Sequence, residues 1–434
     1  MRIQHIIILL LINLWVSPAR AALNLELTQG VSNQLPIAIV PFSGSDNLAE
    51  NNDVSAIIKN DLSNSGQFKV ATPQSGSLPY TLSQVSASYW RNKKFDDVVV
   101  GQIQMISKGQ YRVRFSLVNV AQGQSQALIQ QEFTANEAQL RRLSHHISDL
   151  IYEKLIGLKG IFSTRIAYIL VTDKNSHNRR YSLQVADMDG YNAKPLLISK
   201  QPIMSPAWSC DGRRLAYVSF EKVLPRVYIQ QVNTGERELV SSYSGINGAP
   251  AWSPDDKTLA LALSKDSAVP KIYLMNLANK TLRQVTFGLS IDTEPSFSKD
   301  GRSLLFTSDR GGGPQIYQLN LRSGNVRRVT YDGNYNARAS FANDGKTIVV
   351  LNQEQGSYNI AVQDLNDDNT LQVLTHSGYD ASPSFAPNGQ MLLYESKPGN
   401  RSILGMVSVD GRINLRLPTP QGDVQDPTWS PFMS

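Results

Sequence analysis

One short phrase recurs six times along the C-terminal two thirds of the chain, and its spacing restricts the folds that the chain can adopt. The phrase is Pro, a small residue, an aromatic residue, Ser and a turn, as in residues 206–212. The six copies begin at Pro206, Pro250, Pro295, Ala339, Pro383 and Pro427, which lie 44, 45, 44, 44 and 44 positions apart. This period is typical of four-stranded propeller blades. The repeats therefore predict a β-propeller.

Each repeat also has the internal pattern of four strands. The apolar residues of the phrase suit an innermost strand, and the Asp-Gly or Asn-Gly that usually follows supplies the positive φ of a tight hairpin. A continuous apolar run comes next, as at residues 304–307, which indicates a strand covered on both faces. An alternating strand such as residues 316–321 and a more polar one such as residues 327–330 complete the blade.

The two ends of the repeat array are incomplete in complementary ways. Residues 166–171 match a second strand with no inner-strand phrase before them, whereas the phrase at residues 427–431 has no later strands after it. We expect the C-terminal segment to pair beside residues 166–171 and to close a six-bladed ring, which would remove open sheet edges. An open solenoid is the alternative.

The first 21 residues have the features of an export signal. Arg2 precedes an apolar stretch at residues 6–16, and Ala19-Arg20-Ala21 fits the small-x-small rule of signal peptidase. We expect cleavage after Ala21, export of the chain and a mature chain that begins at Ala22. The apolar stretch is shorter than a membrane-spanning helix requires, and no other segment approaches that length, so we expect no membrane span and a soluble mature protein.

Charge and cysteine content argue against two further classes of protein. Without residues 1–21 the chain has 40 basic and 36 acidic residues in a dispersed pattern, which does not indicate a nucleic-acid partner. Cys210 is the only cysteine, so no intramolecular disulfide can form. Stability must then come from burial and ring closure.

Residues 36 to about 160 have a different pattern, which predicts a small α/β domain. The pattern indicates strands at residues 36–42, 97–104, 111–120 and 126–133, and a helix at residues 54–62. Asn136 is a favourable N-cap for a long amphipathic helix at residues 137–158 that leads into the propeller. We therefore expect a mainly β chain with four parts: a signal peptide (1–21), a flexible segment (22–35), an α/β domain (36–160) and a six-bladed β-propeller (165–434).

This organisation resembles the TolB family. The residues that carry the resemblance are Thr307-Ser308-Asp309-Arg310, Pro314-Gln315-Ile316-Tyr317, the C-terminal Pro427-Thr428-Trp429-Ser430-Pro431, and the strand that begins Leu35-Pro36-Ile37. The resemblance covers essentially the whole mature chain. It implies a non-enzymatic periplasmic adaptor of the Tol-Pal envelope system of Gram-negative bacteria, which supports outer-membrane integrity and cell division, is a monomer by itself and uses no cofactor.

The alternative function is a propeller-based hydrolase or a small-ligand or metal-binding protein. Propeller peptidases place their nucleophile in a Gly-x-Ser-x-Gly elbow, which this chain lacks. His145 and His146 have no partners at a recognised metal spacing, and we expect one to face solvent and the other to lie near the domain seam. The glycines after Arg310 link two strands with no following helix, so a hairpin is expected rather than a phosphate site. No metal site is predicted.

A binding surface is predicted where the chain passes from each outermost strand into the next innermost strand. We expect these connections to be loops that converge as a concave mouth at the propeller axis, although single Asp, Asn and small residues there also suit ordinary turns. The residues are Met204, Ser205, Asn247, Gly248, Ala249, Asp292, Thr293, Glu294, Asn336, Arg338, Asp380, Ser382, Gln425 and Asp426. The resemblance implies that this mouth binds Pal, the peptidoglycan-associated lipoprotein.

The segment after the predicted cleavage site alternates apolar and polar residues. This alternation, over Ala22, Leu23, Asn24, Leu25, Glu26 and Leu27, indicates a strand with one face to bury. The polar residues and glycine that follow favour a flexible tether. The resemblance implies that these six residues bind the C-terminal domain of TolA, for which strand addition is a suitable mode. An edge strand of the α/β domain is the alternative.

Overall fold

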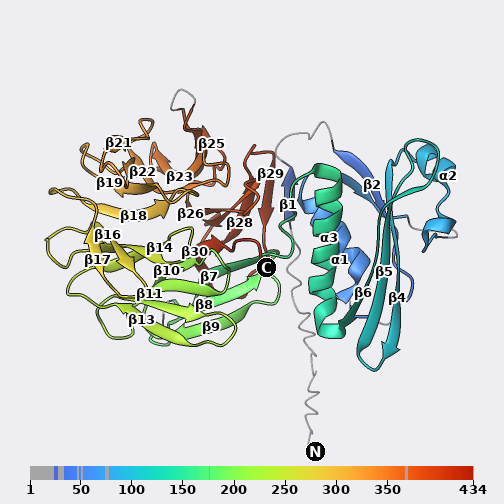
Figure 1. Ribbon diagram of the computed structural model, residues 1–434, viewed down its shortest axis with the longest axis horizontal. Helices are drawn as coiled ribbons and strands as arrows, with labels where there is room; N and C mark the ends of the chain where they lie inside the picture. The colour runs from blue at the N-terminus through green and yellow to red at the C-terminus, as the bar shows by residue number, and fades with distance from the viewer. Residues whose placement is uncertain are drawn as a thin grey trace, which may run out of the picture.

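An α/β domain lies beside a six-bladed β-propeller in the computed structural model of the chain (Figure 1). The structure describes residues 24–27, 34–45, 48–49, 52–73, 78–174, 176–366 and 370–433. The predicted signal peptide, and with it Ala22 and Leu23, lie outside the described residues.

The α/β domain is built on a five-stranded mixed sheet in the order β3-β2-β4-β5-β6. Its strands are β2 (Leu35–Ile39), β3 (Phe68–Ala71), β4 (Asp97–Ser107), β5 (Gln110–Asn119) and β6 (Gln126–Asn136). Its helices are α1 (Val54–Asn64), α2 (Ala87–Asn92) and α3 (Leu140–Ile156), with short 3₁₀ turns η2 (Leu82–Gln84) and η3 (Glu137–Gln139). The apolar sides of α1 and α3 pack on the sheet face nearer the propeller, and α2 packs on the other face (Figure 1).

Local sequence explains where the two long helices begin and end. Asp53 caps α1, because its side chain accepts hydrogen bonds from the backbone N–H groups of Ser55 and Ala56. The cap predicted at Asn136 is confirmed, since Asn136 and Gln139 form a reciprocal capping box ahead of α3. The helix ends at Gly157, whose φ of 80° is readily adopted only by glycine.

The propeller consists of six four-stranded antiparallel sheets, each running from the axis outward. Blade 1 contains β30 (Asp423–Trp429), β7 (Arg165–Thr172), β8 (Arg180–Asp187) and β9 (Lys194–Ser199); blade 2 contains β10 (Ile203–Trp208), β11 (Arg214–Ser219), β12 (Arg226–Gln231) and β13 (Arg237–Ser241). Blade 3 contains β14 (Asn247–Trp252), β15 (Thr258–Leu263), β16 (Lys271–Asn276) and β17 (Leu282–Gln284); blade 4 contains β18 (Asp292–Phe297), β19 (Ser303–Ser308), β20 (Gln315–Asn320) and β21 (Val326–Arg328). Blade 5 contains β22 (Tyr335–Phe341), β23 (Thr347–Glu354), β24 (Ser357–Asp364) and β25 (Gln372–Val373); blade 6 contains β26 (Asp380–Phe385), β27 (Met391–Ser396), β28 (Ile403–Ser408) and β29 (Ile413–Arg416).

The C-terminal strand closes the ring as the sequence predicts. β30 pairs antiparallel with β7, with Thr428 opposite Ala167 and Trp429 opposite Ile166. Trp429 is 4% exposed, and its indole N–H donates to Thr164 Oγ1 at 2.8 Å. The closed ring and the six-bladed, mainly β fold are thus confirmed, and the open solenoid is wrong.

The N-terminal strand β1 (Asn24–Leu27) pairs with the propeller instead of the α/β domain. Its backbone adds to the outer edge of blade 6, with Leu25 opposite Leu415 and Leu27 opposite Ile413 of β29. The alternative of an edge strand in the α/β sheet is wrong. β29 otherwise has an unpaired outer edge, and such an edge readily accepts another strand.

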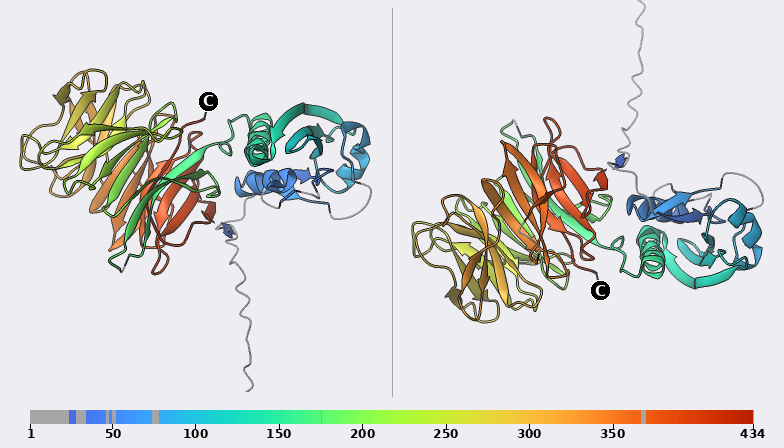
Figure 2. Two further views of the ribbon diagram at one scale, coloured as in Figure 1. Left: turned by 90° about the horizontal axis from the view of Figure 1, so that it is seen from below. Right: turned by 90° about the horizontal axis from the view of Figure 1, so that it is seen from above.

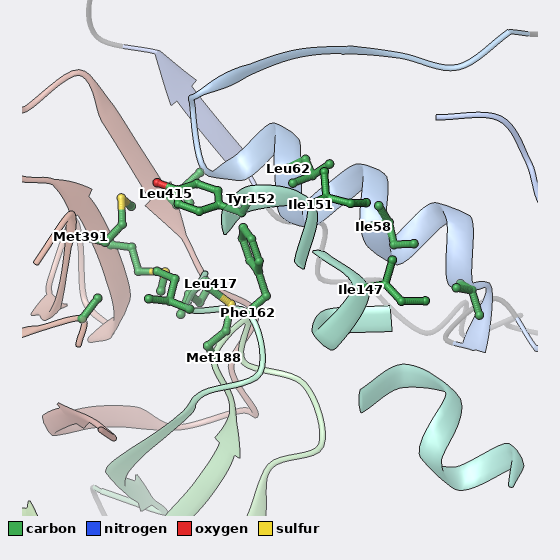
Figure 3. Packing of buried hydrophobic residues seen from close by; sticks show 14 of the residues in the cluster. Ile58, Leu62, Ile147, Ile151, Tyr152, Phe162, Met188, Met391, Leu415 and Leu417 are labelled. Atoms are coloured by element: carbon green, nitrogen blue, oxygen red, sulfur yellow. The ribbon is translucent and has the colours of Figure 1, made fainter. Parts of the chain in front are cut away.

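One apolar cluster continues across the seam between the two domains. Figure 3 shows Ile58 of α1 and Ile151 of α3 leading through Tyr152 to Met391 and Leu415 of the propeller. The linker after α3 is tied to the helix, since Asp149 accepts hydrogen bonds from the N–H groups of Phe162 and Ser163. The α/β domain is set against the rim of blades 1 and 6 in both views of Figure 2.

Candidate functional site

The predicted mouth residues lie within the innermost strands, which corrects their assignment to loops. In every blade the pairing with the second strand slips by one residue, as between Met204, opposite Val218, and Ala207, opposite Ala216. The same slip recurs in the other five inner strands. Three steps along the inner strand therefore match two along its neighbour, which defines a β-bulge.

The residue before each repeated Pro or Ala has a left-handed backbone. We call these six residues the inner ring: Ser205, Ala249, Glu294, Arg338, Ser382 and Asp426, with φ between 46° and 54°. A non-glycine residue costs about 1–2 kcal/mol in this region, so the bulge is a strained feature repeated in all six blades. Strain of this kind persists when the surrounding structure over-determines the backbone, and here it marks the lining of the axial channel.

Arg338 joins the inner ring across the channel. Its Nε lies 3.1 Å from Glu294 Oε1, and its Nη1 lies 2.6 Å from both Asp426 Oδ1 and Ser382 Oγ. Asp426 also accepts a hydrogen bond from the backbone N–H of Ser205. One guanidinium thus connects blades 4, 5, 6 and 1, and Asp426 extends the network to blade 2.

Electrostatics make this network a stable set of ion pairs. Burial disfavours the charged form of Arg338, but Asp426 and Glu294 outweigh this effect and raise the pKa of the guanidinium. Burial likewise opposes ionisation of Asp426, yet Arg338 holds its pKa below the ordinary value. Burial and the charge of Asp426 raise the pKa of the neighbouring Glu395 to about 7.

A hollow of about 380 Å³ runs along the inner strands beside this ring. It is lined by the inner ring and, beyond it, by Trp208, Ser209, Cys210 and Pro431 near the hairpin turns between first and second strands. The hollow thus extends towards the opposite end of the inner strands from the predicted mouth.

Five predicted mouth residues are buried and have a structural role. They are Asn247, Asp292, Asn336, Asp380 and Ser382, all at most 7% exposed. Asp292 accepts hydrogen bonds from Lys271, Ser308 and Arg310, for example, and so ties the start of β18 to the neighbouring strands of blade 4 and to blade 3. The other nine, Met204, Ser205, Gly248, Ala249, Thr293, Glu294, Arg338, Gln425 and Asp426, keep part of their surface accessible.

An apolar rim surrounds the mouth, and of its residues only Met204 belongs to the set predicted from the sequence. Eight large apolar residues between 37% and 96% exposed lie in or just before the starts of five inner strands: Met204, Tyr243, Ile246, Phe287, Leu289, Ile291, Tyr331 and Tyr379. Because all these strands start at one end of the axis, the rim occupies one face of the propeller. That face is opposite to the α/β domain, which packs near the turns between first and second strands, such as Asn388 and Gly389. Exposed apolar clusters of this kind mark protein-binding surfaces. Their signal in the sequence is an apolar residue inside a segment expected to be a polar turn.

The His145–His146 pair and the glycines after Arg310 lie as the sequence predicts. His145 is buried at the domain seam and His146 is exposed, as predicted for the pair. Cys210 is an exposed residue near Asp256; desolvation by its neighbours together with that carboxylate raises the pKa of its thiol to about 12, so the thiol is a poor nucleophile. Arg310 and the glycines after it form the hairpin between β19 and β20.

Within the described residues, one group of three potential ligands comes close enough to hold a metal ion: Asp61, His145 and Asp189. These side chains already have cationic or hydrogen-bonding partners, because His145 and Ser148 contact Asp61 and Arg141 donates to Asp189. The group is therefore an ion-pair cluster. Within the part of the chain that the structure describes, no helix is both long and apolar enough to cross a bilayer.

Comparison with known families decides the relationship. A family model described as the TolB beta propeller domain matches residues 152–433, and one described as the TolB amino-terminal domain matches residues 23–126. The chain belongs to the TolB family. The resemblance stated from the sequence is confirmed.

Individual TolB relatives agree with this assignment. A Tol-Pal system protein TolB from Bordetella pertussis is 41% identical over 98% of this chain and 95% of its own length. A second, from Coxiella burnetii, is 50% identical over 57% of this chain, and the match spans 58% of that relative. The crystal structure of TolB from Acinetobacter baumannii superposes with a TM-score of 0.84 at 39% identity, and covers 95% of this chain and all of that one.

Proposed function

We propose that the chain is a non-enzymatic periplasmic adaptor of the Tol-Pal system, which supports outer-membrane integrity and cell division. The proposal includes export by a signal peptide cleaved after Ala21. Two surfaces would carry the function: the propeller face that bears the apolar rim would bind Pal, and the N-terminal segment would bind the C-terminal domain of TolA. Membership of the TolB family supports the proposed role in the Tol-Pal system.

The apolar rim is the observation that best supports a protein partner on this face. Leu289 is 96% exposed and Phe287 is 68% exposed, although both are large apolar side chains. Together with the nine accessible residues of the predicted mouth, they form an apolar surface around a polar centre. Aromatic and apolar anchors of this size dominate the binding energy of protein interfaces.

The Pal surface can be tested with Leu289→Asp and Phe287→Asp. Each substitution should weaken Pal binding in titration calorimetry by at least tenfold, about 1.4 kcal/mol, because a charge replaces an apolar anchor. Ile198→Asp is the matched control, since Ile198 is 59% exposed on β9, at the outer edge of blade 1. Unchanged affinity in both rim variants would place the Pal interface elsewhere.

The proposed TolA surface is a segment that already forms strand pairs. β1 adds its backbone to β29 in this structure, so residues 24–27 can make the hydrogen bonds that strand addition to a partner requires. Deleting residues 22–29 should abolish TolA binding and leave the affinity for Pal unchanged. TolA binding that survives the deletion would exclude this segment as the docking site.

A further inference from the structure

A compact ionic cluster lies at the seam between the α/β domain and blade 1. It contains Asp61 from α1, Arg141 and His145 from α3, and Asp187 and Asp189 at the turn between β8 and β9. These groups are spread over more than 120 residues of sequence, from Asp61 to Asp189, and the proposed binding surfaces do not use them. His145 is 2% exposed and Asp61 is 5% exposed.

His145 occupies the centre of the cluster. Its Nδ1 lies 2.9 Å from Asp61 Oδ2, and its Nε2 lies 3.7 Å from Asp189 Oδ2, which is ion-pair range. One ring therefore faces a carboxylate of its own domain on one side and a carboxylate of the propeller on the other. The first distance is a hydrogen bond, and the second is an ion-pair distance without one. A neutral imidazole can donate to only one carboxylate, whereas an imidazolium is attracted to both.

Arg141 supports the same contact from one helical turn earlier. Its guanidinium donates to Asp189, its Nε lies 3.5 Å from Asp187 Oδ2, and it stacks 4.3 Å from the ring centre of Tyr191. Arg141 and His145 thus present two cations on one side of α3 to the same turn of the propeller.

We propose that His145, as an imidazolium, is an electrostatic latch that fixes α3 on blade 1, and that its deprotonation loosens the seam between the two domains. The apolar cluster across the seam keeps the domains attached, but apolar contacts are not directional. The ion pairs of His145 and Arg141 with Asp189 set the position of α3 relative to blade 1, while Asp61 holds the imidazolium from the side of the α/β domain.

The balance of charges around the ring supports an imidazolium. Burial opposes the charged form, but Asp61 and Asp189 outweigh burial and the repulsion of Arg141, and raise the pKa of His145 to about 9. Since the pKa is raised in the folded protein, the latch contributes fully below the unfolded value near 6.5 and is lost as the pH rises through 9. Asp149 lies nearby on α3 and adds negative charge next to Asp61.

Hydrogen exchange in the full mature chain tests the latch, with His145→Gln compared against His146→Gln. His146 is the next residue of the same helix but is exposed and packs against Phe133, so its change leaves the seam intact. At pH 7, residues 144–152 and 187–192 should exchange at least tenfold faster in His145→Gln than in either His146→Gln or the unmodified protein. Equal exchange in all three proteins would overturn the proposal.

Two further measurements keep the test decisive if His145→Gln folds poorly. Carbon-detected NMR of the unmodified protein should give His145 a pKa well above 6.5, and a value at or below 6.5 would overturn the latch. Spin labels can be attached to Lys59→Cys on α1 and Lys194→Cys on β9, in a Cys210→Ser background. The distribution of distances between the two labels should be narrow at pH 7 and broader at pH 10. A distribution that stays unchanged over this range would also overturn it.

Discussion

At the scale of single residues, the inner ring shows how a strained backbone positions side chains. Each left-handed residue comes directly before the repeated Pro or Ala, within the bulge of an innermost strand. The extra residue bends the strand and turns one side chain into the channel. This arrangement allows Arg338 to reach Asp426, 88 residues away in sequence. Arg338 also forms an ion pair with Glu294. Both residues thus have a structural role in addition to their proposed role in the mouth that binds Pal.

Replacing Arg338 should destabilise the propeller. Arg338→Met leaves Glu294 and Asp426 close together without their cation. Removing one partner of a buried pair costs about 3–5 kcal/mol, and the 32% exposure of the Arg338 side chain reduces our expectation to about 1–3 kcal/mol. Urea unfolding measures the change. Arg302→Met is the control, because that side chain is 83% exposed, and an equal effect of both substitutions would contradict a structural role for the ring.

Glu395 should make stability depend on pH near neutrality. Its pKa is raised to about 7 in the folded protein, so folding favours the protonated form and stability falls as the pH rises from about 4.5 to 7. Glu395→Gln should therefore raise the unfolding free energy at pH 8 by about 1–3 kcal/mol and change it little at pH 4.5. Thermal unfolding at the two pH values measures the difference. A loss of stability at pH 8 would show that the carboxylate is needed in its ionised form.

At the scale of secondary-structure elements, two strands distant from their sheets in sequence, β1 and β30, join the propeller by strand addition. β30 enters blade 1 as its innermost strand, and β1 extends blade 6 as a fifth strand. The two differ in where they pair. β30 inserts Trp429 into the apolar cluster and pairs along its length with β7, whereas β1 pairs with an outer edge.

Trp429→Ala should accordingly have a large effect. The indole is 4% exposed and donates a hydrogen bond to Thr164, so its removal leaves a cavity and deletes one of the two hydrogen bonds of that hydroxyl, which still donates to the carbonyl of Ile161. Core Trp→Ala substitutions cost about 3–5 kcal/mol. Denaturant unfolding should show a loss in this range, while Phe287→Ala on the exposed rim should stay within about 0.5 kcal/mol. Comparable losses in the two variants would contradict the packing described for β30.

At the scale of the whole molecule, ring closure and the domain seam depend on each other. The apolar cluster contains Trp429 of blade 1, Leu393 of blade 6 and Ile151 of α3, so it joins the closing blades to the α/β domain. Any change that opens the ring between blades 6 and 1 also disturbs the surface on which α3 rests.

Deletion of residues 427–434 should destabilise both domains together. The truncation removes the part of β30 that pairs with Ile166 and Ala167 and exposes an edge of β7. Calorimetry should show a single transition at much lower temperature. Hydrogen exchange should show that backbone amides lose protection in α3 as well as in blade 1. A truncated chain that unfolds at the original temperature would exclude closure by β30.

The sequence by itself determined the period of 44 residues, the strand order within a blade, the closure by the last strand and the cap of the long helix. These features depend on local patterns: apolar alternation, Asp-Gly turns and an Asn three residues before Gln139. Tertiary structure alone decided the rest. The bulge that turns Arg338 towards Asp426 and the meeting of His145 with Asp189 bring together residues far apart in sequence, and the burial of Asn247 and Asp292 depends on how the strands pack. No local pattern specifies such contacts, because a polar residue before a Pro looks the same whether its side chain faces water, a neighbouring blade or the channel.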